Sequence, residues 1–206
     1  MSYSQFRLED IEDKLQLTIQ ECQTLVPKII PCCISDRLQQ ILDYNLPLAL
    51  EIGTEKARSE MIIAPILIEL KRTLEAKISL FSGREFNVDP EQGLVGFCDF
   101  LISRSSSQLI IKSPVMVIVE AKNDNIQSGL GQCIAEMYAS QIFNHRQGNT
   151  VHSIYGSVTT GTNWKFLKLT DRMLEIDIHE YFLNDLETIF GLLNSFVLTS
   201  PTQDIH

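Results

Sequence analysis

Two acidic residues stand in segments whose neighbours are apolar, and a lysine follows one of them. Asp99 lies within Gly-Phe-Cys-Asp-Phe-Leu-Ile, and Glu120 ends the run Val-Met-Val-Ile-Val and is followed by Ala121 and Lys122. Burying a carboxylate is costly unless it is paired or bound to a metal ion. Residues two apart on a strand point to the same side, so Glu120 and Lys122 are expected to face one site, while Ala121 points away and leaves its carbonyl oxygen free as a ligand. The pattern therefore favours a buried site of two acids and a lysine.

These residues also have plainer interpretations. Asp99 could accept hydrogen bonds at a turn, and Glu120 with Lys122 could be a charge pair on the solvated face of an edge strand. The unbroken apolar run before Glu120 argues against an edge position, because such runs are typical of strands that are buried on both faces.

Hydrophobic periodicity indicates the elements that position these residues. Residues 78–86 and 94–102 are expected to be the strands of an antiparallel hairpin, because the residues between them have turn chemistry. The β-branched run 115–119 predicts a central strand that is buried on both faces. Farther along the chain, the pattern predicts a helix over 124–144, strands over 153–159, 164–169 and 173–178, and a helix over 183–196.

The segments before the hairpin have a roughly helical pattern. Apolar residues recur with an approximately helical period over residues 6–25. A shorter helix is expected over 36–44, with Asp36 as the residue that caps its first N–H groups. Thr54 is expected to cap a further helix, which Pro65 kinks or divides.

The order of these elements predicts the fold class. Helices, a hairpin, a central strand, a crossover helix and further strands indicate an α/β protein with a mixed sheet covered by helices. The segments that begin at residues 115, 124 and 153 are expected to form a right-handed crossover unit. The chain then divides into an N-terminal helical extension packed on the core (residues 1–54), a core domain (55–196) and a C-terminal tail (197–206).

The composition is that of an acidic globular protein. The 206 residues carry a formal net charge of −9, which argues against a protein that coats nucleic acid nonspecifically. The charge argues less strongly against a nuclease, because a bound divalent cation reverses the local charge of an acidic site. The longest apolar runs are far shorter than a membrane span, and the N-terminus lacks the layout of a signal peptide. We therefore expect a cytoplasmic protein without a membrane partner.

Asp99, followed by Glu120-Ala121-Lys122, resembles the Asp…(Asp/Glu)-x-Lys signature of the PD-(D/E)xK, or restriction-endonuclease-like, nuclease superfamily. Two further residues match family positions: Glu60 on the preceding helix and Gln132 on the helix after the lysine. The stretch 155–166 is similar to the strand-turn-strand of nuclease domains in type I restriction enzyme motor subunits. The resemblance covers roughly residues 55–180. It departs from the family at residue 98, where a cysteine stands in place of a frequent proline.

The resemblance implies a restriction-endonuclease-like mixed sheet and a metal-dependent DNA endonuclease that hydrolyses phosphodiester bonds. Asp99, Glu120 and the carbonyl oxygen of Ala121 are expected to hold Mg²⁺ or Mn²⁺ through hard oxygen ligands. Lys122 is expected to orient the attacking water or to stabilise the charge that develops on the phosphate.

The remaining expected site residues surround this centre. Glu60 is expected to bind the metal directly or through water, and Gln132 to position the lysine or to contact the DNA backbone. Two pairs of polar residues, one on the preceding helix and one after a later turn, are candidates for substrate contacts. They are Lys56, Arg58, Asn163 and Lys165.

A second interpretation stays open at this point. The same fold could serve as a catalytically weak or inactive interaction or regulatory subunit, whose acidic surface contacts a protein partner. Cleavage of both strands of a duplex usually implies a symmetric dimer. The apolar faces of the N-terminal helices could supply that contact.

Overall fold

The computed structural model describes residues 1–149 and 151–198. The expected C-terminal tail therefore lies outside the described residues, apart from Val197 and Leu198, which end the last helix. No helix within the described ranges is long and apolar enough to cross a membrane.

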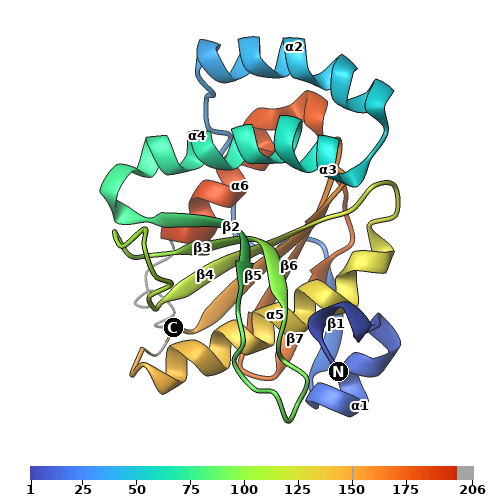
Figure 1. Cartoon of the computed structure of the whole chain (residues 1–206), viewed down its shortest axis with the longest axis vertical. Helices are drawn as coiled ribbons and strands as arrows, with labels where there is room; N and C mark the ends of the chain where they lie inside the picture. Colours follow the sequence, from blue (N-terminus) through green and yellow to red (C-terminus); the bar gives the residue numbers. More distant parts are fainter. Residues whose placement is uncertain (150, 199–206) are drawn as a thin grey trace.

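A mixed sheet of eight strands forms the centre of the molecule (Figure 1). Its order is β1-β7-β6-β5-β4-β3-β2, and β8 pairs with β6. The predicted α/β class, with a mixed sheet flanked by helices, is confirmed. The strands are β1 (Thr18–Cys22), β2 (Ser79–Glu85), β3 (Phe97–Ser103), β4 (Val115–Ala121), β5 (Ser153–Thr159), β6 (Asn163–Thr170), β7 (Met173–Asp177) and β8 (Tyr181–Phe182).

The part of the sheet that carries the candidate residues has the expected connections. β2 and β3 form an antiparallel hairpin, and β3 pairs antiparallel with β4. β4 then pairs parallel with β5, because the chain returns through the long helix α5 (Gln127–Arg146). Every residue of β4 is buried, so the predicted central strand is confirmed.

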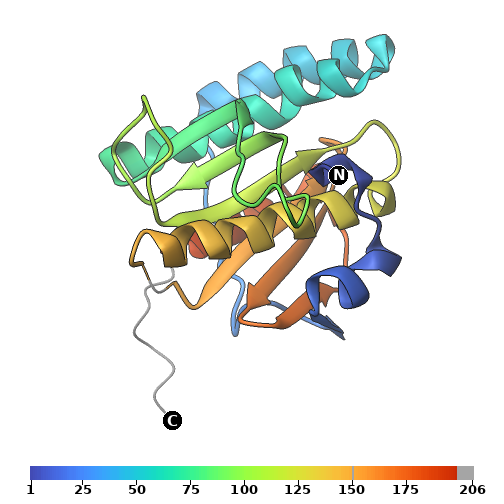
Figure 2. The ribbon, with the colours of Figure 1, turned by 60° about the horizontal axis from the view of Figure 1, so that its bottom comes forward.

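Helices cover both faces of the sheet (Figure 2). Helices α4 and α6 pack on one face, with α2 as an outer layer on α4 and η3 (Figure 1), and α5 packs with the N-terminal turns on the other face. β4 supplies both cores: Ile118 faces the α5 side and Val119 faces the α4 side. The remaining helical bounds are η1 (Tyr3–Gln5), η2 (Leu8–Asp10), α1 (Ile11–Leu15), α2 (Asp36–Ile52), α3 (Glu55–Arg58), the π-helical turn η3 (Ser59–Ile63), α4 (Ala64–Leu74), η4 (Glu75–Lys77), η5 (Leu183–Asp185) and α6 (Leu186–Leu198).

The helix expected over residues 6–25 is wrong beyond Leu15. Helix α1 ends where Gln16 adopts a left-handed backbone conformation, with φ of 54°. The chain then forms β1, which pairs parallel with β7 at the edge of the sheet. Only Ile19 and Cys22 of β1 are partly buried and its other residues are exposed, so the strand has no alternating apolar pattern that would distinguish it in the sequence. The N-terminal region is therefore not purely helical, because it contributes a strand to the main sheet.

The next two helices differ from expectation at their ends. Ser35, and not Asp36, caps α2, because its hydroxyl oxygen accepts the N–H of Leu38 at 3.2 Å. Helix α2 also continues to Ile52, well beyond the expected end at residue 44. Thr54 caps α3 as predicted, and the π-helical turn η3 interrupts the helix just before Pro65. Such turns insert an extra residue and often occur at functional sites.

Candidate active site

The β3–β4 pairing brings the two predicted acids together. The register that pairs Phe100 with Val119 places Asp99 opposite Glu120. The main-chain N–H of Ala121 donates a hydrogen bond of 2.8 Å to Oδ2 of Asp99. Asp99 is thus held at the strand end by the residue between Glu120 and Lys122.

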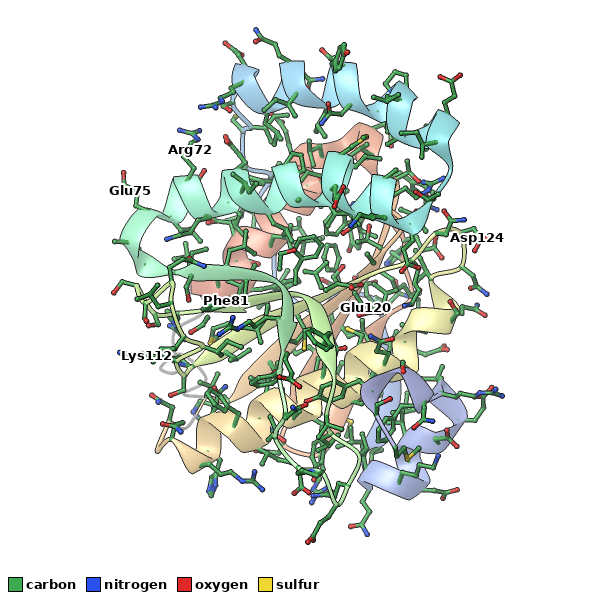
Figure 3. The ribbon with its side chains drawn as sticks, viewed as in Figure 1. Arg72, Glu75, Phe81, Lys112, Glu120 and Asp124 are labelled. Atoms are coloured by element: carbon green, nitrogen blue, oxygen red, sulfur yellow. The ribbon has the colours of Figure 1, made fainter. Side chains whose placement is uncertain are left out.

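Glu120 is a buried carboxylate with one oxygen in use. Its side chain is 1% exposed, and Figure 3 shows it in the interior, whereas Asp124 lies at the surface. Oε1 accepts a hydrogen bond of 2.5 Å from Nζ of Lys122. Oε2 has no hydrogen-bond partner among the described residues, although it is buried. The predicted acid–lysine pair therefore forms inside the protein, and one carboxylate oxygen remains available for a ligand.

The site has the electrostatics of crowded acids. Burial and the charge of Asp99 raise the pKa of Glu120 to about 8, although Lys122 opposes this rise. Burial alone would lower the pKa of Lys122, but the charge and hydrogen bond of Glu120 outweigh burial and raise it. Lys122 is therefore a permanent cation near neutral pH, suited to stabilising negative charge and unsuited to accepting a proton.

Glu136 on α5 is a further site residue that the sequence reasoning missed. Its side chain is fully buried, and Nε2 of Gln132 donates to its Oε1 at 3.0 Å. Burial and the charge of Glu120 raise the pKa of Glu136 well above its usual range. The hydrogen bonds of Gln132 and of the Cys98 thiol oppose this rise. Gln132 thus reaches the site through this acid. The available signal was an acid among residues 133–140 of α5, a run that is buried throughout.

Glu60 lies on the expected helix but does not join the buried acids. Its side chain is 61% exposed and pairs at 3.1 Å with Nζ of Lys56, which is 81% exposed. The acid of this segment that affects the pKa values of Glu120 and Lys122 is instead Glu55, the first residue of α3. The roles predicted for Glu60 and Lys56 remain predictions.

The other expected substrate contacts separate into two places. Arg58 and Asn163 line one cavity with residues 123–127, the loop that follows Lys122. Nη1 of Arg58 donates to the Thr160 carbonyl oxygen at 3.1 Å. Lys165 lines a neighbouring cavity, where its Nζ donates to the Ile178 carbonyl oxygen at 3.0 Å. The structure therefore brings Arg58 and Asn163 close to the end of β4, and Lys165 lies beyond them.

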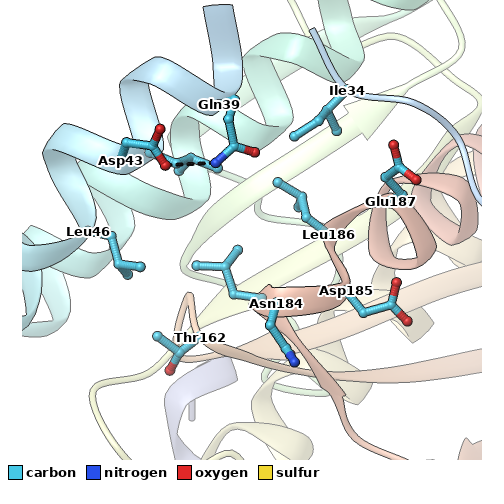
Figure 4. A pocket seen from close by; sticks show the side chains of 11 residues that line it. Ile34, Gln39, Asp43, Leu46, Thr162, Asn184, Asp185, Leu186 and Glu187 are labelled. Atoms are coloured by element: carbon cyan, nitrogen blue, oxygen red, sulfur yellow. Dashed lines mark hydrogen bonds between the residues drawn. The ribbon is translucent and has the colours of Figure 1, made fainter. Parts of the chain in front are cut away.

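Another cavity lies between α2 and the start of α6 (Figure 4). Apolar side chains such as Leu42, Leu46 and Leu186 line it together with the acids Asp43, Asp185 and Glu187. None of the candidate catalytic residues contributes to its wall. This cavity is therefore not part of the acid–lysine site.

Two carboxylates and main-chain oxygens form the donor set that a divalent cation would meet at this site. Within residues 1–149 and 151–198, no three His, Cys, Asp or Glu side chains are grouped so that they could hold a metal ion. Asp99 and Glu120 supply two carboxylates, and main-chain carbonyl oxygens are the further hard ligands at hand. A cation would relieve the repulsion that raises the pKa of Glu120 and would give its partnerless Oε2 a ligand role. The residues present therefore fit such an ion.

Comparison with known proteins found no family model that matches this sequence and no curated protein that is similar to it.

Proposed function

We propose that this chain is a metal-dependent DNA endonuclease of the PD-(D/E)xK type. The observation that carries the proposal is the convergence of Asp99, Glu120 and Lys122 at one strand end. Asp99 reaches this end through the Ala121 N–H, and Glu120 and Lys122 share a hydrogen bond there. Buried acids with perturbed pKa values beside a lysine are typical of catalytic sites.

The connectivity around this site supports the same assignment. Helix α4, the β2–β3 hairpin, β4, α5 and β5 follow one another in the chain, with β4 and β5 parallel. This order is the one that the resemblance to restriction-endonuclease-like proteins implies. The acids lie on the two inner strands of this unit, where the α5 crossover begins.

The side chains divide the work of phosphodiester hydrolysis between them. A divalent cation bound by Asp99 and Glu120 would polarise the phosphate and lower the pKa of a water molecule. Lys122 provides a fixed positive charge for the phosphate oxygens, since its pKa is raised. Nζ of Lys122, which donates to Glu120, would be the donor nearest to hand for a phosphate oxygen if Asp99 and Glu120 held a cation. Gln132 and Glu136 hold the helix side of the site.

A second candidate function rests on the outer face of α2. Tyr44, Leu48 and Ile52 lie at intervals of four residues, so they form one stripe, and all three are exposed. Exposed apolar stripes mark protein contacts. The chain could then act as an interaction subunit, or the stripe could join two copies of a dimeric nuclease.

Cleavage assays separate these functions. The purified protein is incubated with plasmid, linear duplex and single-stranded DNA in Mg²⁺, Mn²⁺ or EDTA, beside Lys122→Ala and the exposed-lysine control Lys28→Ala. We expect metal-dependent cutting that Lys122→Ala reduces by about a hundredfold or more, as when a group that stabilises developing charge is removed. The control is expected to cut like the wild type.

The contrary outcomes are equally clear. Cutting that is equal in wild type and Lys122→Ala would assign the activity to another site or to a contaminant. No cutting, together with no calorimetric binding of Mg²⁺ or Mn²⁺, would favour the interaction subunit.

A further inference from the structure

A cavity of about 380 Å³ opens next to the candidate active site. Its walls are the β4–α5 loop from Asn123 to Gln127, the β5–β6 turn with Asn163, the side chain of Arg58, and Glu180. Two of its lining residues, Asn123 and Thr160, directly follow Lys122 and Thr159, and the Lys122 N–H donates to the Thr159 carbonyl oxygen at 2.8 Å, so the cavity adjoins the end of β4 that carries Lys122. Its volume is within the range of cavities that bind small ligands.

The chemistry of the walls does not match a phosphate. Among the described residues of the lining, Arg58 is the one cation, and it stands against two acids, Asp124 and Glu180. A site that selects phosphate groups has an excess of Lys and Arg. The lining is instead dominated by groups that both donate and accept hydrogen bonds, namely the amides of Asn123, Asn125, Gln127 and Asn163 and the hydroxyls of Thr160 and Thr162.

Amides and carboxylates are the groups that proteins use to contact the edges of nucleobases. Asn and Gln pair with adenine through one donor and one acceptor, and Asp and Glu accept from the amino group of cytosine. The Asn163 amide donates a hydrogen bond of 3.3 Å to the Glu180 carboxylate, so an amide and a carboxylate stand side by side in the wall of this cavity.

Two buried side-chain atoms of the lining have no hydrogen-bond partner among residues 1–149 and 151–198. Nε of Arg58 and Oδ1 of Asn123 are buried, and neither makes a hydrogen bond within the described part of the chain. One is a donor and the other an acceptor, and leaving such groups unpaired is unfavourable. A ligand that carries both an acceptor and a donor would satisfy them if the two side chains turn toward it. The edge of a nucleobase has both.

We infer that this cavity binds an unpaired nucleobase beside the phosphate that is cut, so that the substrate is single-stranded or locally opened DNA. The inference rests on the proposed function, because the acid–lysine site supplies the phosphate chemistry. A base inside a duplex uses its pairing edge for its partner strand, and enzymes that bind such an edge take the base out of the stack. The net charge of −9 agrees, since tracking a long duplex needs many phosphate contacts.

Binding measured without cleavage tests the cavity. Fluorescence anisotropy in EDTA compares a labelled single-stranded oligonucleotide with its duplex on Lys122→Ala, which keeps cutting out of the measurement. Asn163→Ala and Glu180→Gln are added separately to this background, with the exposed amide Gln40→Ala as the matched control. Circular dichroism confirms that each variant is folded.

We expect tighter binding of the single strand than of the duplex. Asn163→Ala and Glu180→Gln each weaken single-strand binding by about three- to tenfold, the effect of one lost hydrogen bond, and leave duplex binding unchanged. Gln40→Ala changes neither. Tighter duplex binding, or an equal loss for both DNA forms, would overturn the inference.

The outcome is separable from that of the proposed function. Cutting of duplex and single strands at equal rates by the wild type and by Asn163→Ala would keep the nuclease and reject the base cavity. Selective single-strand binding that Asn163→Ala weakens, with no cutting by the wild type, would keep the cavity and reject the nuclease.

Discussion

Replacing Glu120 by Gln tests the electrostatic account of the site. Because the folded state raises the pKa of Glu120, it holds this proton more tightly than the unfolded chain does. The contribution of this group to stability is therefore greatest at low pH, below its ordinary pKa, and is lost as the pH rises toward the raised value. Glu120→Gln keeps the shape of the side chain and removes the titration, so the variant should not show this loss.

The size of the effect follows from the pKa. Burial and the Asp99 charge raise the pKa of Glu120 from 4.5 to about 8. At about 1.4 kcal/mol per pH unit, this range corresponds to a loss of up to about 5 kcal/mol in the free energy of unfolding. Glu136 adds to the loss, because its pKa is raised by burial and by the Glu120 charge.

Urea denaturation in EDTA between about pH 5 and 9 measures this difference. The wild type should lose stability with rising pH by several kcal/mol more than Glu120→Gln does. The exposed acid Glu60 provides the matched control, and Glu60→Gln should follow the wild type. Parallel pH curves for the wild type and Glu120→Gln would refute the conclusion that burial and Asp99 strain this carboxylate.

Three further outcomes follow from the structure. Mg²⁺ affinity, measured by calorimetry, should rise by about tenfold per pH unit up to about pH 8 and then level off, because Glu120 must lose its proton to bind the ion. The side-chain amide of Asn144 hydrogen-bonds both the N–H and the carbonyl oxygen of Val115. Asn144→Ala should therefore lower the free energy of unfolding in urea by about 2–4 kcal/mol. A loss below about 1 kcal/mol would contradict this. In Gly131→Ala, the new Cβ would lie 2.5 Å from the Phe6 carbonyl oxygen, so residues 1–10 should exchange their amide hydrogens faster than in the wild type; unchanged exchange would count against this packing.

The strands around the site were predictable because their patterns are strong. The apolar run of β4 indicates a buried strand, and the turn residues between β2 and β3 indicate a hairpin. Both predictions are confirmed. Asp99 and Glu120 were visible for the same reason, since an acid within a strand of apolar residues stands out.

The errors have physical causes of their own. In the N-terminal segment, β1 has only two partly buried residues, and the partner strand that selects its conformation lies far along the chain. Glu136 was missed because a helix that is buried on nearly all sides has no polar face to contrast with one acid. Glu55, and not Glu60, affects the pKa of Glu120 because of how α3 and the π-helical turn are oriented. Residue spacing does not determine that orientation.

The pairing of β1 with β7 has a consequence for synthesis of the protein. Arg172 bonds the Leu15 carbonyl oxygen across 157 positions, and Thr18 pairs with Met173. At about 5–20 residues per second, β1 waits roughly 10–30 s for β7 to leave the ribosome. The residues of β1 thus enter the sheet only after β7 has been synthesised, and until then their apolar side chains are open to chaperones.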